Sequence, residues 1–218
     1  MLVAGCVCCM LMYAQRTSLE QRMEKHGLVD IHSVDSTIRV SLMYARADNF
    51  TGRVLYNDLA KAYLLPEAAQ ALARAQRMLK RLHPGYTLVV FDATRPMSVQ
   101  QRMWNVVEGT SKAIYVSNPA HGGGLHNYGL AVDISIADAR GDTIPMGTRV
   151  DYLGKAAHVS DEAIRVQRGT LGKQAYQNRL LLRRVMRQAG FKTLPCEWWH
   201  FNYKTRAELR RSGYKPIR

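Results

Sequence analysis

The sequence predicts a single α+β domain, built from a mainly antiparallel sheet with flanking helices. Stretches typical of strands and helices follow one another without the regular strand–helix–strand alternation of a parallel sheet. The chain has 218 residues, of which 47% are hydrophobic, which is enough to bury one substantial core. It contains no internal repeat, low-complexity tract or linker rich in proline and glycine. We therefore expect one domain over residues 15–218, preceded by a short leader.

The leader comprises residues 1–14, which carry no charged side chain and consist mainly of apolar residues and cysteine. This run is too short to cross a bilayer, which takes about 20 residues, and Ala14 offers a small residue for cleavage. We predict a signal peptide and export to the periplasm. Two alternatives stay open because no positive charge precedes the apolar run: a true start upstream of residue 1, or a short buried helix in a cytoplasmic protein. A lipoprotein is a third alternative, because residues 3–6 resemble a lipoprotein cleavage box with Cys6 as its cysteine.

The first helix is predicted over residues 66–82, after an N-terminal region that we expect to be extended. Its apolar residues recur at helical spacing and leave the arginines on the opposite side. These apolar residues are Ala68, Leu72, Ala75, Leu79 and Leu82. A strand over residues 86–92 and a helix over residues 98–107 are expected next.

A second strand is predicted over residues 130–136, where apolar residues alternate with small or polar ones. The residues expected to face the core are Leu130, Val132, Ile134 and Ile136. The residues expected to face the other way are Ala131, Asp133 and Ser135. This pattern holds Asp133 rigidly on the wall of a cleft on the open face of the sheet.

A variable loop over residues 138–173 leads into a helix over residues 174–189 and a final strand over residues 197–203. Gly190 is the expected C-cap of the helix. The apolar positions of this helix are Leu181, Val185 and Met186. Its arginines are expected on a solvated face: Arg179, Arg183, Arg184 and Arg187.

Two short motifs supply the side chains of a metal site. His126 precedes the strand that carries Asp133, and the glycines around His126 allow the loop to fold back toward that strand. A catalytic zinc takes three protein ligands and keeps a fourth position for water, so His200 is the candidate third ligand. Glu197 lies three residues earlier, where it would reach the water as a general base. The other histidines considered, expected to be solvent-facing or supporting residues, are His83, His121 and His158.

Five segments resemble, in the same order, those of the VanX-type zinc D-alanyl-D-alanine dipeptidases, which are related to the zinc D,D-carboxypeptidases of cell-wall metabolism. The resemblance covers roughly residues 28–203, and its segments are residues 44–52, 91–96, 126–133, 145–151 and 197–200. It implies one zinc ion per chain, with His126, Asp133 and His200 as ligands and Glu197 as the base.

The same resemblance implies roles for three further residues. Arg95 would stabilise the tetrahedral oxyanion, and Tyr44 and Asp151 would lie near the amino end of the dipeptide. One position departs from the family, which usually has a serine two residues before the first zinc histidine. This chain has Gly124 there, so the resemblance does not extend to a role of that hydroxyl in holding substrate.

The implied reaction is hydrolysis of D-alanyl-D-alanine by metal-activated water. A D,D-carboxypeptidase that acts on longer cell-wall peptides is the alternative enzyme, and recognition of the substrate's free ammonium by Tyr44 and Asp151 would favour the dipeptidase. A thiol hydrolase based on Cys196 is disfavoured, because a lone cysteine is usually a small buried hydrophobe. Cys6, Cys8 and Cys9 fall in the leader, so no internal disulfide is expected in the mature chain.

The formal charge of +14 raises the question of a polyanionic partner. Nucleic-acid binding needs basic residues gathered on one surface, ideally with aromatic residues for stacking. Each basic cluster of this chain is instead expected on a solvated helix face or in the C-terminal tail. We therefore expect no nucleic-acid partner and no membrane span, and we predict association with anionic envelope polymers. A basic envelope-binding module without activity is the non-enzymatic alternative.

Overall fold

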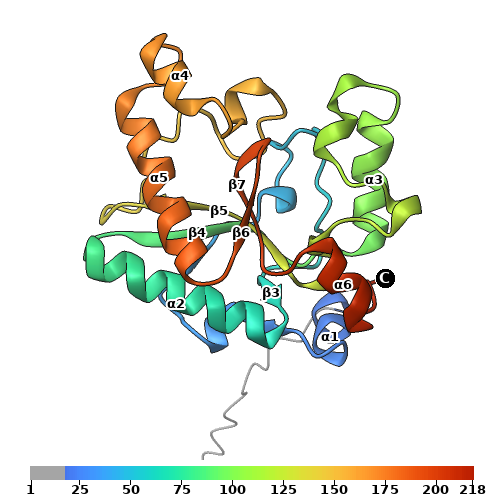
Figure 1. The fold of residues 1–218 in the computed structure, drawn as a ribbon. Coiled ribbons are helices and arrows are strands. Elements are labelled where there is room, and N and C mark those ends of the chain that lie inside the picture. Colours follow the sequence, from blue (N-terminus) through green and yellow to red (C-terminus); the bar gives the residue numbers. More distant parts are fainter. Residues whose placement is uncertain (1–17) are drawn as a thin grey trace, which may run out of the picture.

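A five-stranded sheet runs through the centre of the computed structural model, which describes residues 18–218 (Figure 1). The strands lie in the order β2-β4-β5-β7-β6. Their bounds are Arg39–Val40 (β2), Thr87–Asp92 (β4), Ala131–Ala137 (β5), Lys192–Leu194 (β6) and Glu197–Asn202 (β7). The sheet is mixed, because β2 pairs with β4 in parallel and the other neighbours are antiparallel. A separate antiparallel pair joins β1 (Val29–Asp30) to β3 (Tyr63–Leu64).

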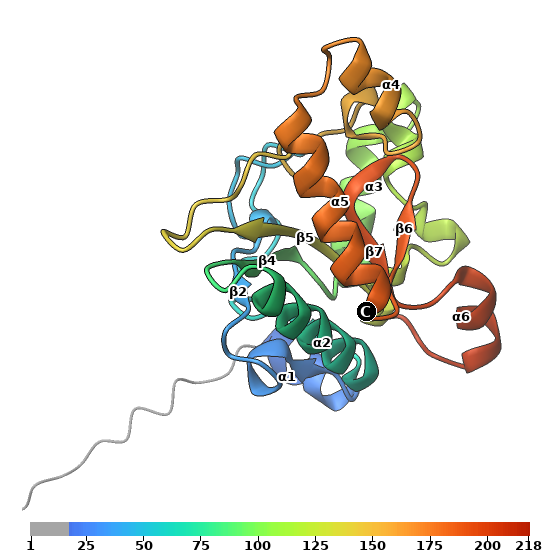
Figure 2. The same cartoon turned by 60° about the vertical axis from the view of Figure 1, so that its left-hand side comes forward.

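Helices pack around this sheet, as Figures 1 and 2 show, with α2 and α5 side by side and α3 on the other side of the molecule. The helix bounds are Ser18–Lys25 (α1), Pro66–Leu82 (α2), Met97–Val107 (α3), Glu162–Gln167 (α4), Lys173–Gln188 (α5) and Arg206–Ser212 (α6). The prediction of one α+β domain is confirmed.

The longest helix agrees with its prediction at both ends. Pro66 opens α2 at the first helical position, where its missing N–H costs no hydrogen bond. Ala68, Leu72 and Leu79 are completely buried, as the apolar stripe requires. Leu82 was expected in the same stripe but is 40% exposed, because the helix ends there and its last turn passes the edge of the core.

The prediction of a solvated arginine face on α5 is wrong for Arg179. Its side chain is completely buried and forms an ion pair of 3.0 Å with Glu162. Its guanidinium also lies 5.5 Å from the ring centroid of Trp198 and donates to the carbonyl oxygen of Met146. Arg183 binds the second carboxylate oxygen of Glu162. A buried charge is tolerable when it is paired and hydrogen-bonded, and α4, which supplies Glu162, was predicted as loop.

The strand pairing brings residues distant in sequence to one place. Asp133 in β5 lies opposite His200 in β7 and, across an irregularity of the register, opposite Asp92 in β4. All residues of β5 are buried, so both faces of this strand are covered. Asp133 therefore stands on a rigid central strand with neighbours on either side.

The elements absent from the prediction are short or lie near the ends of the chain. The N-terminal region, expected to be extended, contains α1, and β6 forms an antiparallel pair with β7. The C-terminal helix α6 begins with a capping box, in which Thr205 and Glu208 satisfy each other's backbone N–H groups.

Within residues 18–218 we find no helix with the length and apolar character needed to span a membrane. The leader predicted over residues 1–14, together with Cys6, Cys8 and Cys9, lies outside the residues that the structure describes.

Candidate active site

A cleft of about 600 Å³ is lined by all seven residues predicted for the site. Those side chains are Tyr44, Arg95, His126, Asp133, Asp151, Glu197 and His200. They come from five separate segments of the chain, and strands β5 and β7 supply three of them.

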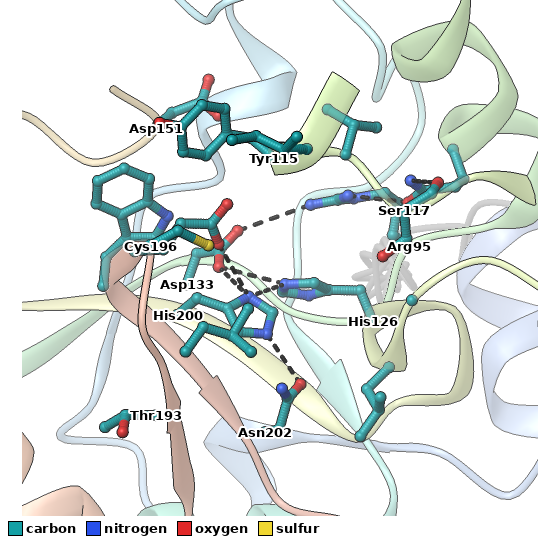
Figure 3. A pocket seen from close by; sticks show the side chains of 18 of the residues that line it. Arg95, Tyr115, Ser117, His126, Asp133, Asp151, Thr193, Cys196, His200 and Asn202 are labelled. Carbon is teal, nitrogen blue, oxygen red and sulfur yellow. Dashed lines mark hydrogen bonds and ion pairs between the residues drawn. The ribbon is translucent and has the colours of Figure 1, made fainter. Parts of the chain in front are cut away.

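Three of these side chains meet at one point of the cleft (Figure 3). His126 Nε2 lies 3.2 Å from Asp133 Oδ1 and 3.2 Å from His200 Nδ1, and His200 Nδ1 lies 3.0 Å from Asp133 Oδ1. All three residues are buried. Among residues 18–218, they form the one group of histidine, cysteine or acidic residues close enough together to hold a metal ion.

The outer nitrogens of the two imidazoles determine what the inner ones can do. His126 Nδ1 lies 2.6 Å from the carbonyl oxygen of Ala93, and His200 Nε2 lies 2.8 Å from Asn202 Oδ1. Both partners are acceptors, so each outer nitrogen carries a proton. The inner nitrogens therefore face each other and the Asp133 carboxylate. A protonated inner nitrogen donates to Asp133, and an unprotonated one presents a lone pair, so the three inner atoms offer a metal ion two nitrogen ligands and one oxygen ligand once these protons leave.

The loop that carries His126 depends on glycine at two positions. Gly129 has φ of +68°, and a Cβ there would lie 3.0 Å from the backbone nitrogen of Leu65. Gly123 has φ of +67°, and a Cβ there would collide with the side chain of Asn127. Any other residue would be strained in these conformations. The glycines let the short 3₁₀ helix Leu125–Tyr128 bring His126 to Asp133.

Glu197 lies beside the three candidate ligands but does not belong to the group that could hold a metal ion. Its Oε2 is 3.8 Å from His200 Nδ1, and no hydrogen bond to another described residue occupies its carboxylate. Burial raises the pKa of Glu197 to about 7; the His200 ring opposes this rise, whereas Asp133 and Asp151 add to it. By contrast, the pKa of Asp133 is held well below its usual range. Burial alone would raise this pKa, but contact with His126 and His200 lowers it. The pKa values of two neighbouring carboxyl groups are thus shifted in opposite directions, a feature of acid–base sites.

Arg95 is fixed by carboxylate and amide partners. Its Nε and Nη2 donate to Asp92 Oδ2 at 2.9 and 2.5 Å, and its Nη1 donates to Gln100 Oε1 at 3.0 Å. Nη2 also lies 3.6 Å from Asp133 Oδ2. A guanidinium has five N–H donors, so two remain for another acceptor. Asp92 and Gln100, which hold Arg95 in place, were not singled out from the sequence.

Asp151 and Tyr44 meet in another part of the cleft. The Tyr44 hydroxyl donates to Asp151 Oδ1 at 2.9 Å, and the backbone N–H of Phe50 donates to Asp151 Oδ2 at 3.0 Å. Among residues 18–218, Asp151 is the one non-glycine residue with positive φ, at 68°, a strained conformation of the kind often found at functional sites. Burial raises the pKa of Asp151 to about 7, although the two hydrogen bonds oppose this rise.

The competing metal and thiol candidates lie in other environments. The ring of His83 stacks on Tyr86, His158 Nε2 bonds to the Tyr115 hydroxyl, and His121 is exposed. Cys196 lines the cleft, but burial raises the pKa of its thiol to about 11. A nucleophilic cysteine needs the opposite shift.

Replacing Asp151 by asparagine is expected to stabilise the fold at pH 8. Since the folded-state pKa of Asp151 is raised from 3.8 to about 7, the folded protein binds this proton more tightly than the unfolded chain. The group's contribution to stability is therefore fully present below pH about 4 and lost as pH rises through about 7. At about 1.4 kcal/mol per pKa unit, the loss is at most about 4 kcal/mol. Asparagine also tolerates positive φ.

Thermal denaturation of both proteins at pH 4 and pH 8 measures this effect. The variant should gain stability over the wild type at pH 8 and show little difference at pH 4. An equal change at both pH values would show that the charge of Asp151 is not the cause.

Comparison with known proteins shows to which family the chain belongs. Residues 24–214 match the model of the family described as D-ala-D-ala dipeptidase, Peptidase_M15. The chain is 30% identical over 174 residues to the D-alanyl-D-alanine dipeptidase of Escherichia coli (strain K12), covering 80% of this chain and 83% of that protein. It is 25% identical over 199 residues to the enzyme of the same name from Enterococcus faecium, covering 80% and 90%. It is 30% identical over 187 residues to that of Streptomyces coelicolor, covering 78% and 87%. The chain therefore belongs to the D-ala-D-ala dipeptidase family of peptidases.

Proposed function

We propose that this protein is a zinc-dependent dipeptidase that hydrolyses the peptide bond of D-alanyl-D-alanine. The observation that carries the proposal is the convergence of two imidazole nitrogens and one carboxylate in a cleft, next to the buried Glu197 carboxylate, which has no hydrogen-bond partner among residues 18–218. Two nitrogen ligands, one oxygen ligand and an open position form a ligand set typical of catalytic zinc. The matched relatives, which carry the name D-alanyl-D-alanine dipeptidase, support the choice of substrate.

The residues that would hold zinc are His126, Asp133 and His200. When bound, zinc supplies a Lewis acid that polarises a carbonyl and lowers the pKa of water toward neutrality. Ala93 and Asn202 would keep the imidazole rings oriented through their outer nitrogens.

Glu197 is the proposed proton carrier. A general base works best when its pKa lies near the working pH, and burial places that of Glu197 at about 7. The carboxylate takes a proton from the attacking water and passes it to the leaving amine. The protonated Glu197 is tolerated in between because its surroundings disfavour the charged form.

Arg95 is the proposed partner of the oxyanion that develops on the scissile carbonyl. Its guanidinium is already held by Asp92 and Gln100, so little reorganisation is needed during the reaction. Donors fixed in advance in this way stabilise the transition state more than the ground state.

Asp151 and Tyr44 are the proposed site of the substrate's ammonium group. Burial and the Asp151 charge raise the pKa of the Tyr44 phenol well above its usual range, so Tyr44 remains a donor that orients Asp151. Each Asp151 oxygen accepts one hydrogen bond from the protein and has a further lone pair for an ammonium. An N-acylated substrate has no such charge, so recognition here distinguishes a dipeptidase from a carboxypeptidase that trims longer peptides.

The substrate preference is tested by comparing D-Ala-D-Ala with L-Ala-L-Ala and with N-acetyl-D-Ala-D-Ala, each with and without a chelator. We expect turnover of D-Ala-D-Ala but not of L-Ala-L-Ala, and we expect the chelator to abolish it. Acylation should lower kcat/KM by about 10- to 100-fold, since the Asp151 carboxylate is then buried without its cationic partner. Equal turnover of free and acylated substrate would favour the D,D-carboxypeptidase, and turnover that survives chelation would contradict the metal site.

Export to the periplasm and association with anionic envelope polymers belong to the same proposal. They are supported by the uncharged, apolar residues 1–14 and by the formal charge of +14. N-terminal sequencing of the protein recovered from fractionated cells tests export. A mature protein that begins after Ala14 in the periplasmic fraction is the expected result, and an intact N-terminus in the cytoplasm would contradict it.

A further inference from the structure

Two of the four cations that line the cleft, Lys204 and Arg206, have no carboxylate partner among residues 18–218. Arg95 pairs with Asp92 and Lys192 with Glu208, and the Lys204 ammonium lies 5.2 Å from the ring centroid of Tyr203. Arg206 also lines the cleft but makes no ion pair with any carboxylate of residues 18–218. Arg206 is exposed and lines the cleft, and a cation without a carboxylate partner in such a position is suited to bind an anionic group of the ligand.

The side chain of Arg206 is nevertheless held in place. Its Nη2 donates to the carbonyl oxygen of Gly123 at 2.8 Å and to Ser117 Oγ at 3.2 Å. Its Nε and Nη1 have no acceptor among the described residues, so these donors remain available. The guanidinium is thus oriented without being saturated, which lowers the entropy cost of binding a ligand.

Ser117 offers a second donor beside Arg206. Its Oγ accepts from Arg206, and its hydroxyl hydrogen has no acceptor among residues 18–218. Its carbonyl oxygen accepts from Gln100 Nε2 at 2.7 Å, and Gln100 in turn accepts from Arg95. This chain of hydrogen bonds fixes Ser117 relative to Arg95.

The position of Ser117 also accounts for the glycine at position 124. A Cβ on Gly124 would lie 2.9 Å from Ser117 Oγ and 3.3 Å from Ser117 Cβ. Ser117 therefore fills the space that a side chain two residues before His126 would occupy. A hydroxyl group lines this part of the cleft although residue 124 has none.

We infer that Arg206 and Ser117 form the subsite for the C-terminal carboxylate of the substrate. Figure 3 shows Asp151 above the left-hand part of the group formed by His126, Asp133 and His200, and Ser117 above its right-hand part. A zwitterionic dipeptide would thus place its ammonium at Asp151, its carboxylate at Arg206 and Ser117, and its peptide bond at the three ligands between them. This inference rests on the proposed dipeptidase function and adds the residues that make the enzyme require a free carboxylate.

The test compares D-Ala-D-Ala with its C-terminal amide in the zinc-loaded wild type and in Arg206→Gln. The wild type should cleave the free acid with a kcat/KM about 10- to 100-fold above that of the amide, the range expected for hydrogen bonds to a charged group. Arg206→Gln should raise KM for the free acid by a similar factor and change kcat/KM for the amide by less than about twofold. Arg210→Gln, an exposed residue of the same helix outside the cleft, should change neither.

The contribution of Ser117 is tested by removing its hydroxyl group and then introducing a hydroxyl group at position 124. Ser117→Gly should raise KM for the free acid by roughly 10-fold, the lower end of the range expected for a hydrogen bond to a charged group. The double variant Ser117→Gly with Gly124→Ser should recover most of this loss. Position 124 has an extended backbone, with φ of −111° and ψ of 178°, so serine is allowed there and the vacated space can receive its side chain.

The possible outcomes separate the subsite from the function on which it rests. If the wild type cleaves the acid and the amide equally well, or if Arg206→Gln slows both substrates by the same factor, the subsite is wrong and Arg206 only supports the loop around Gly123. If the zinc-loaded wild type cleaves neither substrate, the proposed dipeptidase function itself is overturned. Selective loss of activity on the free acid supports the subsite.

Discussion

His200→Ala is expected to abolish hydrolysis of D-Ala-D-Ala and to release the metal. His200 provides one of three candidate ligand atoms that lie 3.0 to 3.2 Å apart, and two remaining ligands hold zinc weakly. Activity should fall to background, and the metal content should fall from about one ion per chain to near zero. Because the candidate ligands come from the loop before β5, from β5 and from β7, loss of the ion should also lower the melting temperature.

Elemental analysis, activity assays and thermal denaturation of the same preparation measure these three effects. His83→Ala is the matched control, because His83 stacks on Tyr86 outside the cleft and should keep metal and activity. Chelated wild type should resemble His200→Ala in all three measurements. A fully active preparation without metal would refute the site.

The elements that the sequence predicted well are those with long, regular patterns. The helix α2 repeats its apolar spacing over several turns, and β5 alternates over most of its length, so local sequence suffices to define them. Short elements such as β6 and α4 have no comparable period. They form because they pack against neighbours from other parts of the chain, which local patterns do not encode.

Arg179 shows the same limit at the level of a single residue. Its spacing on α5 is that of a solvated arginine, and its burial depends on Glu162 and Trp198, which lie 17 and 19 positions away in the sequence. Intrinsic preference places arginine at the surface. Only the tertiary arrangement provides the partners that make its burial tolerable.

The candidate ligands were predictable because their residue types are chemically distinctive and lie in two compact motifs. The residues that hydrogen-bond to the candidate ligands or line the cleft beside them were harder to predict from the sequence, with one exception. Asn202 follows His200 by two positions on the same strand, so the alternation of side chains places both on one face, and this signal could have been used. Ser117 and Arg206 are separated by 89 positions, and no local pattern indicates that their side chains meet.

Glu197→Gln is expected to keep the metal and lose almost all activity. Glutamine preserves the shape of the side chain and removes the basic oxygen, so proton transfer from water is lost. Removal of a general base typically costs about 10² to 10⁴ in rate. Because the same carboxyl group would also return the proton to the leaving amine, we expect a fall in kcat of roughly 10⁴ or more with little change in KM.

Metal content distinguishes this role from that of a ligand, and stability excludes misfolding. If Glu197→Gln lost the metal as His200→Ala does, Glu197 would be a ligand and the base would have to be another residue; if the variant stayed active, the proposed mechanism would be wrong. Burial raises the pKa of Glu197 from 4.5 to about 7, so its contribution to stability is present below pH about 4.5 and lost as pH rises through about 7. A neutral glutamine should therefore melt at the same or a higher temperature than the wild type at pH 8. An inactive variant that binds metal and is at least as stable as the wild type can have lost only the chemistry of the carboxylate.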